Sequence, residues 1–250
     1  MRDLPVLQVP SGADDPAYEL AVAQAMVDHA RDPTSPPLIR AYRAGAAVVA
    51  FGRRDSRLPG FPDAARAARA HGFIPLIRAA GGRAVAYTDA CLVVDHVEHD
   101  PSPWDEQESR FARFGLAYVA ALADLGVAAR LGPVPGEYCP GAHSVNARGV
   151  VKLIGTAQRI TSGSWLFSSV VIVDDADPIR AVLADVYAAL GQPFEAGSVG
   201  SLRLERPDLP VDELNRLLLG AHSADWQAQP VLADPTLLAR ARELAPRHRP

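Results

Sequence analysis

The sequence predicts an α+β (mixed α/β) fold, with a largely antiparallel central sheet flanked by helices. Apolar runs with strand-like alternation follow one another directly, helical repeats are interspersed, and neither G-x-G-x-x-G nor G-x-x-x-x-G-K-[ST] follows a strand. Consecutive strands without crossover helices favour antiparallel pairing. The missing glycine motifs disfavour dinucleotide-binding and P-loop folds. The architecture expected is that of class II aminoacyl-tRNA synthetases and biotin synthetases, as one domain over 1–250 whose portion from about residue 178 is helical.

Helical spacing of apolar residues, bounded by capping and breaking residues, predicts the helices. Asp14, Asp15 and Pro16 open the first of them, because acids and proline are favoured at a helix start. Gly72 and Gly126 end two others, since glycine adopts the left-handed conformation of a helix C-terminus. The predicted helices cover residues 16–30, 63–72, 105–126, 177–191, 211–226 and 235–245.

Short apolar runs between breakers predict the strands. A hairpin is expected over 144–161, with its turn at Asn146–Gly149, and the density of Pro and Gly makes residues 133–143 a loop. The other predicted strands cover residues 38–44, 46–52, 73–79, the segment after the 80–83 turn, 90–97, 127–132 and 164–174.

Composition narrows the function classes. The net charge is −4 with a pI near 6.0 and no Lys/Arg-rich face, so nucleic acid is not an expected partner. Two cysteines fit a reducing cytoplasm better than a disulfide scaffold. No leader-like start and no apolar run of about 18 residues is visible, so a cytoplasmic protein without membrane contact is expected.

A diglycine between two predicted strands is the first candidate site element. Gly81-Gly82 would let the backbone approach a ligand closely with N–H groups pointing outward. Arg78 and Arg83 flank it. A plain hairpin turn with exposed arginines is the alternative interpretation.

Cys139 and Lys152 form the second candidate element. Cys139 stands in the Pro/Gly loop, where a nearby cation would favour the nucleophilic thiolate and His143 could act as base. Lys152 is the single lysine of the chain and interrupts an apolar strand, so an inward ammonium must be paired or must hold an oxygen. The alternatives are an inert cysteine and a lysine on the exposed face of an edge strand. Cys91, in an apolar run, is expected in the core.

A metal site is the remaining alternative. His96 and His99 are three apart with acids nearby. In a strand these two side chains point to opposite faces, so no metal site is expected.

Together these elements resemble the biotin/lipoate A/B protein ligase family. The family stretch R-x-x-G-G-x-x-V-x-x-x-D corresponds to residues 78–89, and its lysine hairpin G-x-K-x-x-G-x-A-Q-R-R corresponds to residues 149–160. The chain departs from the pattern at three places: one extra residue precedes Lys152, Ile160 replaces the second Arg, and Asp55 replaces a Gln. Typical ligases of the family carry a third glycine where this chain has Arg83, a position that varies in the transferase branch. The resemblance covers roughly residues 15–220.

The Cys139 loop makes the sequence similar to the cysteine-dependent octanoyl-[glycine cleavage H protein]:protein octanoyltransferase branch. That resemblance implies octanoyl or lipoyl transfer through a Cys139 thioester onto the lysine of an apo lipoyl domain or glycine cleavage H protein, by a monomer without cofactor, with Lys152 holding the acyl oxygen. An ATP- and Mg-dependent lipoate–protein ligase and a non-catalytic carrier-binding homologue remain alternatives. The implied substrate-binding residues are Arg78, Gly81, Gly82, Arg83, Ala84, Val85, Tyr87, His143, Gly155, Thr156 and Ala157.

Overall fold

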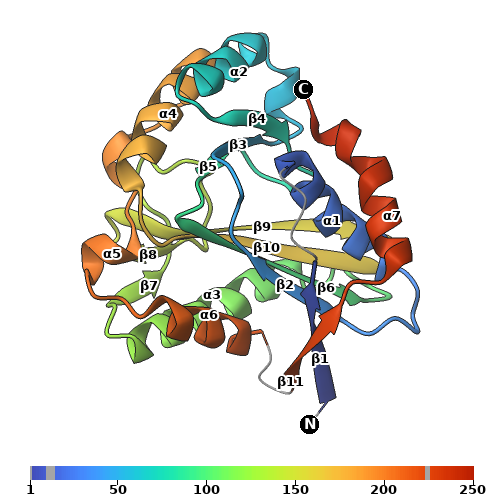
Figure 1. The fold of residues 1–250 in the computed structure, drawn as a ribbon. Helices are drawn as coiled ribbons and strands as arrows, with labels where there is room; N and C mark the ends of the chain where they lie inside the picture. Colours follow the sequence, from blue (N-terminus) through green and yellow to red (C-terminus); the bar gives the residue numbers. More distant parts are fainter. Residues whose placement is uncertain (1, 10–14, 223–225) are drawn as a thin grey trace.

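The computed structural model describes residues 2–9, 15–222 and 226–250. A large mixed sheet crosses the molecule, with strand order β11-β1-β2-β6-β10-β9-β8-β7 (Figure 1). Its strands are β1 (Arg2–Gln8), β2 (Leu38–Tyr42), β6 (Cys91–His99), β7 (Ala129–Leu131), β8 (Val145–Ala147), β9 (Val151–Thr161), β10 (Ser164–Ile172) and β11 (Trp226–Leu232). Pairing is antiparallel from β2 to β7 and parallel at the β2-β1-β11 end, which confirms the largely antiparallel sheet.

A second, three-stranded sheet with order β4-β3-β5 lies over one face of the large sheet (Figure 1). It consists of β3 (Val48–Phe51), β4 (Ile74–Ile77) and β5 (Val85–Tyr87). The segment 78–84 connects β4 to β5, but both strands pair with β3 and not with each other. The interpretation of the diglycine as a plain hairpin turn is therefore wrong.

Helices cover both faces of the large sheet, and each predicted helix is present. Most ends differ from the prediction by one or two residues at most, but the helix predicted over 211–226 ends at Gly220. The helices are α1 (Pro16–His29), α2 (Phe61–Ala70), α3 (Gln107–Asp124), α4 (Ala176–Ala189), α5 (Leu202–Glu205), α6 (Val211–Gly220) and α7 (Pro235–Leu244), with 3₁₀ turns at Asp55–Arg57, Ala196–Ser198 and Ala245–His248. Asp15 caps α1 by accepting a hydrogen bond from the N–H of Ala17 at 3.1 Å.

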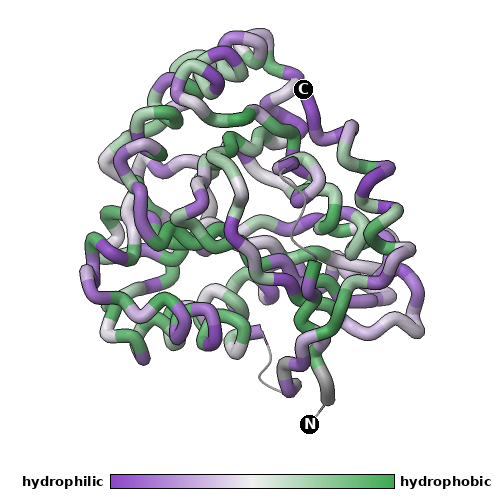
Figure 2. The backbone as a smooth tube through the Cα atoms, viewed as in Figure 1, coloured by the Kyte–Doolittle hydropathy of each residue, from purple (hydrophilic) through white to green (hydrophobic). Residues whose placement is uncertain are grey.

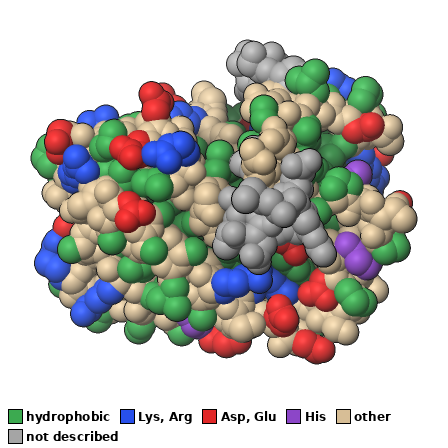
Figure 3. Space-filling model, turned by 90° about the horizontal axis from the view of Figure 1, so that it is seen from below, with side chains coloured by type: hydrophobic (Ala, Val, Ile, Leu, Met, Phe, Trp, Pro, Cys, Tyr) green, Lys and Arg blue, Asp and Glu red, His purple; other side chains and the backbone are tan. Residues whose placement is uncertain are grey.

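Alternation along the strands decides which layer each side chain enters. On β6, Val93 and Val97 pack with the small sheet and α1, whereas Leu92 and Val94 pack against α3 and α6. Hydrophobic segments follow the central strands, while hydrophilic residues recur along outer helices such as α7 (Figure 2). Among the described residues on the α3/α6 side, acidic and basic side chains are interspersed (Figure 3). The structure contains no helix that is long and apolar enough to span a bilayer, within the ranges it describes.

Two strands were missed by the sequence analysis. β1 was not predicted. Trp226 was assigned to a helix but begins β11, so the portion after residue 178 is helical except for this strand. Residues 223–225 of that predicted helix lie outside the described ranges. Pro5 and Pro230 weaken the strand signal. The two strands pair with each other across nearly the whole length of the chain, which no local pattern records.

Candidate active site

The backbone of Cys139 is held in an uncommon conformation. Its φ is 43°, and only two other non-glycine residues in the described ranges have a positive φ. Such left-handed backbone costs about 1–3 kcal/mol in a non-glycine residue and persists where the surroundings enforce it. Here the Cys139 N–H donates to the Tyr187 hydroxyl at 2.7 Å, and that hydroxyl donates to the carbonyl of Ala84 at 2.9 Å. The loop is thus tied to α4 and to the start of β5.

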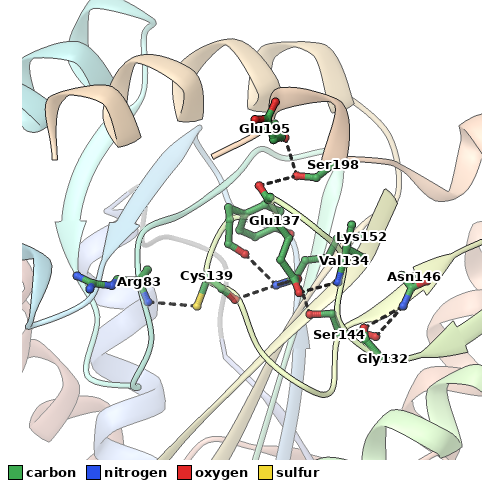
Figure 4. A network of polar contacts seen from close by, with 12 residues as sticks. Arg83, Gly132, Val134, Glu137, Cys139, Ser144, Asn146, Lys152, Glu195 and Ser198 are labelled. Atoms are coloured by element: carbon green, nitrogen blue, oxygen red, sulfur yellow. Dashed lines mark hydrogen bonds and ion pairs between the residues drawn. The ribbon is translucent and has the colours of Figure 1, made fainter. Parts of the chain in front are cut away.

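The sulfur of Cys139 faces two N–H donors from the 78–83 segment. The Arg83 backbone N–H lies 3.2 Å from Sγ (Figure 4). Arg78 Nη2 lies 3.4 Å from the same sulfur. A Cβ on Gly82, which has φ +94°, would lie 2.5 Å from Sγ and 2.7 Å from Arg78 Nη2, so only glycine allows this approach. A guanidinium and a backbone N–H are thus both directed at a partly exposed sulfur.

Asp55, which replaces a Gln of the family pattern, contacts Arg83, which stands where typical ligases have a third glycine. Arg83 Nη1 lies 3.0 Å from Asp55 Oδ1, and the N–H of Gly52 donates to Asp55 Oδ2 at 3.2 Å. Asp55 is fully buried. The pair therefore fixes the segment whose N–H contacts the sulfur of Cys139, and the replacement of a family Gln by Asp55 coincides with the replacement of a glycine by Arg83.

Lys152 is buried and points toward the Cys139 loop, so its assignment to an exposed edge face is wrong. Its ammonium donates to Glu137 Oε2 at 2.8 Å, to the Tyr138 carbonyl at 3.0 Å and to the Cys139 carbonyl at 3.1 Å (Figure 4). An ammonium has three N–H donors, and all three are taken. The lysine therefore fixes the carbonyl side of Cys139, while Arg83 approaches the sulfur side.

Glu137, which the sequence analysis did not single out, completes this anchor. It is 2% exposed, and it accepts hydrogen bonds from the Val134 N–H at 3.0 Å and the Ser144 hydroxyl at 2.5 Å in addition to Lys152. A buried carboxylate with three donors is well compensated. The sequence signal for Glu137 was its position two residues before Cys139.

One cavity of about 290 Å³ brings the predicted site residues together, and we call it the cysteine cavity. Gly81-Gly82 and Lys152 both border this one space. His143 also lines it; its ring stacks on Phe111 with centroids 5.9 Å apart, and its Nε2 lies 3.5 Å from Glu108 Oε1. The predicted residues that line it are Gly81, Gly82, Cys139, His143, Lys152, Thr156 and Ala157.

Residues of the small sheet and of β6 and β10 line a second cavity, which we call the closed cavity. The segment 78–82 links the two, because its first three residues line the closed cavity and its last two line the cysteine cavity. The volume of the closed cavity is about 30 Å³, and three predicted residues, Arg78, Val85 and Tyr87, line it. Its walls are otherwise mostly apolar, apart from Asp95 and Ser168, which the sequence analysis missed although Asp95 interrupts an apolar strand run. The remaining lining residues are Leu20, Ala23, Tyr42, Ala50, Ala79, Ala80, Val93, Leu166 and Val170.

Three predicted binding residues, Arg83, Ala84 and Gly155, line neither cavity. Arg83 contributes its backbone N–H, which contacts the sulfur of Cys139. Val85 and Tyr87 face the closed cavity, and strand alternation turns Ala84 away from it. Gly155 leaves room for Lys152, whose Cε would lie 3.1 Å from a Cβ placed there. Ala84 and Gly155 are therefore structural supports of the site and do not line either cavity.

The other cysteine, Cys91, and the histidine pair His96 and His222 lie in the core. Cys91 is fully buried, as expected, and burial raises the pKa of its thiol to about 11. His96 Nδ1 lies 3.1 Å from His222 Nδ1, and burial lowers the pKa of His222 far below its usual value. Within the described ranges no group of three or more His, Cys, Asp or Glu is arranged to hold a metal.

The fold and this arrangement of residues define a member of the lipoyl protein ligase family. A sequence profile of the lipoyl protein ligase A/B catalytic domain matches residues 15–223, and the chain belongs to this family. The fold matches lipoate-protein ligase A bound with ATP, with a TM-score of 0.78, 21% identity and coverage of 98% of this chain and 95% of that one. It also matches Ta0514 of T. acidophilum, a putative lipoate protein ligase with bound lipoic acid, with a TM-score of 0.78, 21% identity and coverage of 99% and 96%.

A curated relative shares more sequence over a shorter segment. The octanoyl-[GcvH]:protein N-octanoyltransferase of Exiguobacterium sibiricum is 32% identical over 143 residues, which are 57% of this chain. The match spans about half, 52%, of that relative's length.

Proposed function

We propose that this protein is an acyltransferase that moves an octanoyl or lipoyl group through a thioester on Cys139 to the lysine of a lipoyl domain or H protein. The observation that carries the proposal is the Cys139 sulfur, which faces two N–H donors at the border of the cysteine cavity. An ATP-dependent ligase needs no nucleophile there. Family membership and the name of the E. sibiricum relative support the choice of acyl group and acceptor.

In the first half-reaction, the Cys139 thiolate attacks the carbonyl of an acyl thioester on a carrier. The carbon–sulfur bond to the carrier breaks, and the carrier thiol leaves with a proton while the acyl group stays on Cys139. The developing oxyanion needs donors. Gly82 N–H has no acceptor within the described residues, and Lys152 can exchange its contact with the Cys139 carbonyl for the acyl oxygen. One such donor contributes about 10²–10³-fold in rate.

In the second half-reaction, the amine of the acceptor lysine attacks the thioester. The new amide bond forms, the bond to Cys139 breaks, and the thiolate returns. The attacking nitrogen must lose a proton, and His143 at the cavity wall is the base that this proposal assigns. Glu108 and Phe111 keep the imidazole in place.

The closed cavity holds the acyl chain in this proposal. Arg78, Ala79 and Ala80 line it, while Gly81 and Gly82 of the same segment line the cysteine cavity. At about 30 Å³ it has room for about two water molecules, so its walls must part when the chain enters. Each buried CH₂ then contributes roughly 0.8 kcal/mol.

The proposal is tested by intact mass after mixing the protein with an octanoyl thioester donor in the absence of ATP. We expect a mass increase of one octanoyl group, removed by hydroxylamine and transferred to an apo lipoyl domain. ATP–pyrophosphate exchange with octanoate is the parallel assay. Exchange without a covalent acyl-enzyme would assign the ATP-dependent ligase, and neither product would indicate a carrier-binding homologue.

Asp55→Asn is expected to slow acyl-enzyme formation by about 10-fold with little change in KM. The charge that holds Arg83 is lost, so the N–H that contacts the Cys139 sulfur is less well placed, and a charged hydrogen bond of this kind contributes about 1.5–3 kcal/mol. The rate of Cys139 alkylation should fall in parallel. Asp63→Asn, in an exposed pair with Arg66, is the matched control and should change neither rate. Equal effects of the two variants would rule out the positioning role.

A further inference from the structure

We propose that the closed cavity selects a medium-length acyl group that carries a hydrogen-bond donor on its chain, a thiol or a hydroxyl, and that Asp95 is the acceptor that selects it. The inference rests on the proposed function and specifies the class of acyl group that this site takes.

Strand register places a polar row along the path from the cysteine cavity. Ser168 of β10 pairs with Ala157 of β9 on one side and with Asp95 of β6 on the other. Directly paired residues present their side chains on the same face of a sheet. Ala157 lines the cysteine cavity, and Ser168 and Asp95 line the closed cavity. Two strand spacings, about 9.5 Å, separate β9 from β6, so Asp95 lies toward the far end of an eight-carbon chain.

The surroundings of this row suit an alkyl chain. The large sheet forms the floor of the closed cavity. Val93 and Val170 pair with each other two residues along their strands from Asp95 and Ser168, and Leu166 lies two residues from Ser168 in the other direction. Ala50 and Val85 of the small sheet lie in the opposite wall. The carboxylate of Asp95 is therefore the charged acceptor in a space that is otherwise built for hydrocarbon.

Asp95 has an unused hydrogen-bonding oxygen. The residue is 1% exposed, Ser168 hydrogen-bonds to its carboxyl, and its Oδ2 has no partner in the described structure. Arg40, its neighbour in the row, is engaged instead by Glu19 and lies 4.0 Å over the ring of Tyr42. Burial raises the pKa of Asp95 to about 6, while Ser168 and Arg40 lower it. At pH 7.5 the group is thus mostly an ionised acceptor.

The chain that fills the cavity decides whether this oxygen is satisfied. A plain octanoyl chain would exclude water and leave Oδ2 of Asp95 without a donor, which costs binding free energy. A chain with a thiol or hydroxyl at that depth supplies the donor. A site that hydrogen-bonds a substrate group discriminates strongly against an analogue that lacks the group. An apolar pocket discriminates much less between chains that differ by one methylene.

The test compares thioester donors carrying octanoyl, 6,8-dihydroxyoctanoyl and 6,8-dimercaptooctanoyl chains. For the wild-type protein we expect kcat/KM for acyl-enzyme formation to favour the donor-bearing chains by about 10- to 100-fold. Asp95→Leu should abolish or reverse this preference, and Asp95→Asn should leave an intermediate one. Val170→Leu, in the adjacent floor row, is the matched control and should slow all three chains equally. The two donor-bearing chains separate thiol from hydroxyl recognition.

A second readout does not depend on turnover. Calorimetric binding of the free octanoic and 6,8-dihydroxyoctanoic acids to the wild-type and Asp95→Leu proteins should show the same change of preference. If octanoyl forms the acyl-enzyme as well as the other chains do, and Asp95→Leu changes nothing, the selection is refuted while the acyltransferase stands. If no chain forms an acyl-enzyme, the proposed function fails and the calorimetric preference alone decides the role of Asp95.

Discussion

Cys139→Ser is expected to abolish acyl transfer, with a fall in kcat of at least ~10³-fold, while leaving the melting temperature within a few degrees of the wild type. A serine hydroxyl is far less ionised than a thiol and has no base in the positions that contact Sγ, where the neighbours are the donors Arg78 Nη2 and Arg83 N–H. The side chain is partly exposed and borders the cysteine cavity, so its replacement leaves no void in the core. Activity is measured with a thioester donor and an apo lipoyl domain.

Cys91 is the matched control for that variant, because the chain contains two cysteines in opposite environments. Cys91→Ser places a hydroxyl in the core and should lower the free energy of unfolding by about 1–3 kcal/mol without loss of transfer. Burial raises the pKa of the Cys91 thiol, which keeps it protonated at neutral pH. A limiting dose of iodoacetamide should therefore modify Cys139 first, and an acyl donor should protect it. Preferential labelling of Cys91, or normal transfer by Cys139→Ser, would remove the nucleophile from the mechanism.

The sequence was sufficient for those parts of the fold that depend on local periodicity. The 16–30 repeat became α1, and the hairpin around Arg148 and Gly149 formed with both residues at positive φ. The division into two sheets was not predictable in this way. The runs at 38–44 and 46–52 look alike, yet β2 joins the large sheet and β3 the small one. Pairing partners are set by tertiary packing, and strand propensity carries no record of them.

The same distinction applies to the site. Chemical type made Cys139 and Lys152 recognisable, because an accessible thiol and a solitary inward ammonium both need an explanation. Their supports were not recognisable: Tyr187 reaches Cys139 from α4, and Asp55 reaches Arg83 from a 3₁₀ turn. These contacts join segments that are distant in sequence. Two residues did carry a sequence signal: Asp95 is a charged residue inside an apolar strand, and Glu137 stands two residues before Cys139.

Lys152→Arg is expected to lower acyl transfer by at least ~100-fold, although the charge is kept. The ammonium fits among three oxygens, and Gly155 is the neighbour that leaves room for its stem. A guanidinium is planar and larger, so it cannot direct single N–H donors to the same three acceptors, and its bulk should cost about 1–3 kcal/mol of stability. The measurement is single-turnover acyl-enzyme formation together with thermal unfolding. Turnover above a tenth of the wild-type value would show that the site does not require a lysine.

Stability and catalysis can be separated at this position by a compensated variant. Lys152→Met alone leaves Glu137 as a buried, uncompensated charge, and breaking such a pair costs about 3–5 kcal/mol. Adding Glu137→Gln removes that charge, so the double variant should regain most of the lost stability. If Lys152 takes part in the reaction through its ammonium, the double variant should stay inactive despite its recovered fold. If transfer instead returns along with the melting temperature, the ammonium is not needed, and the role at the acyl oxygen would then belong to backbone donors such as the Gly82 N–H.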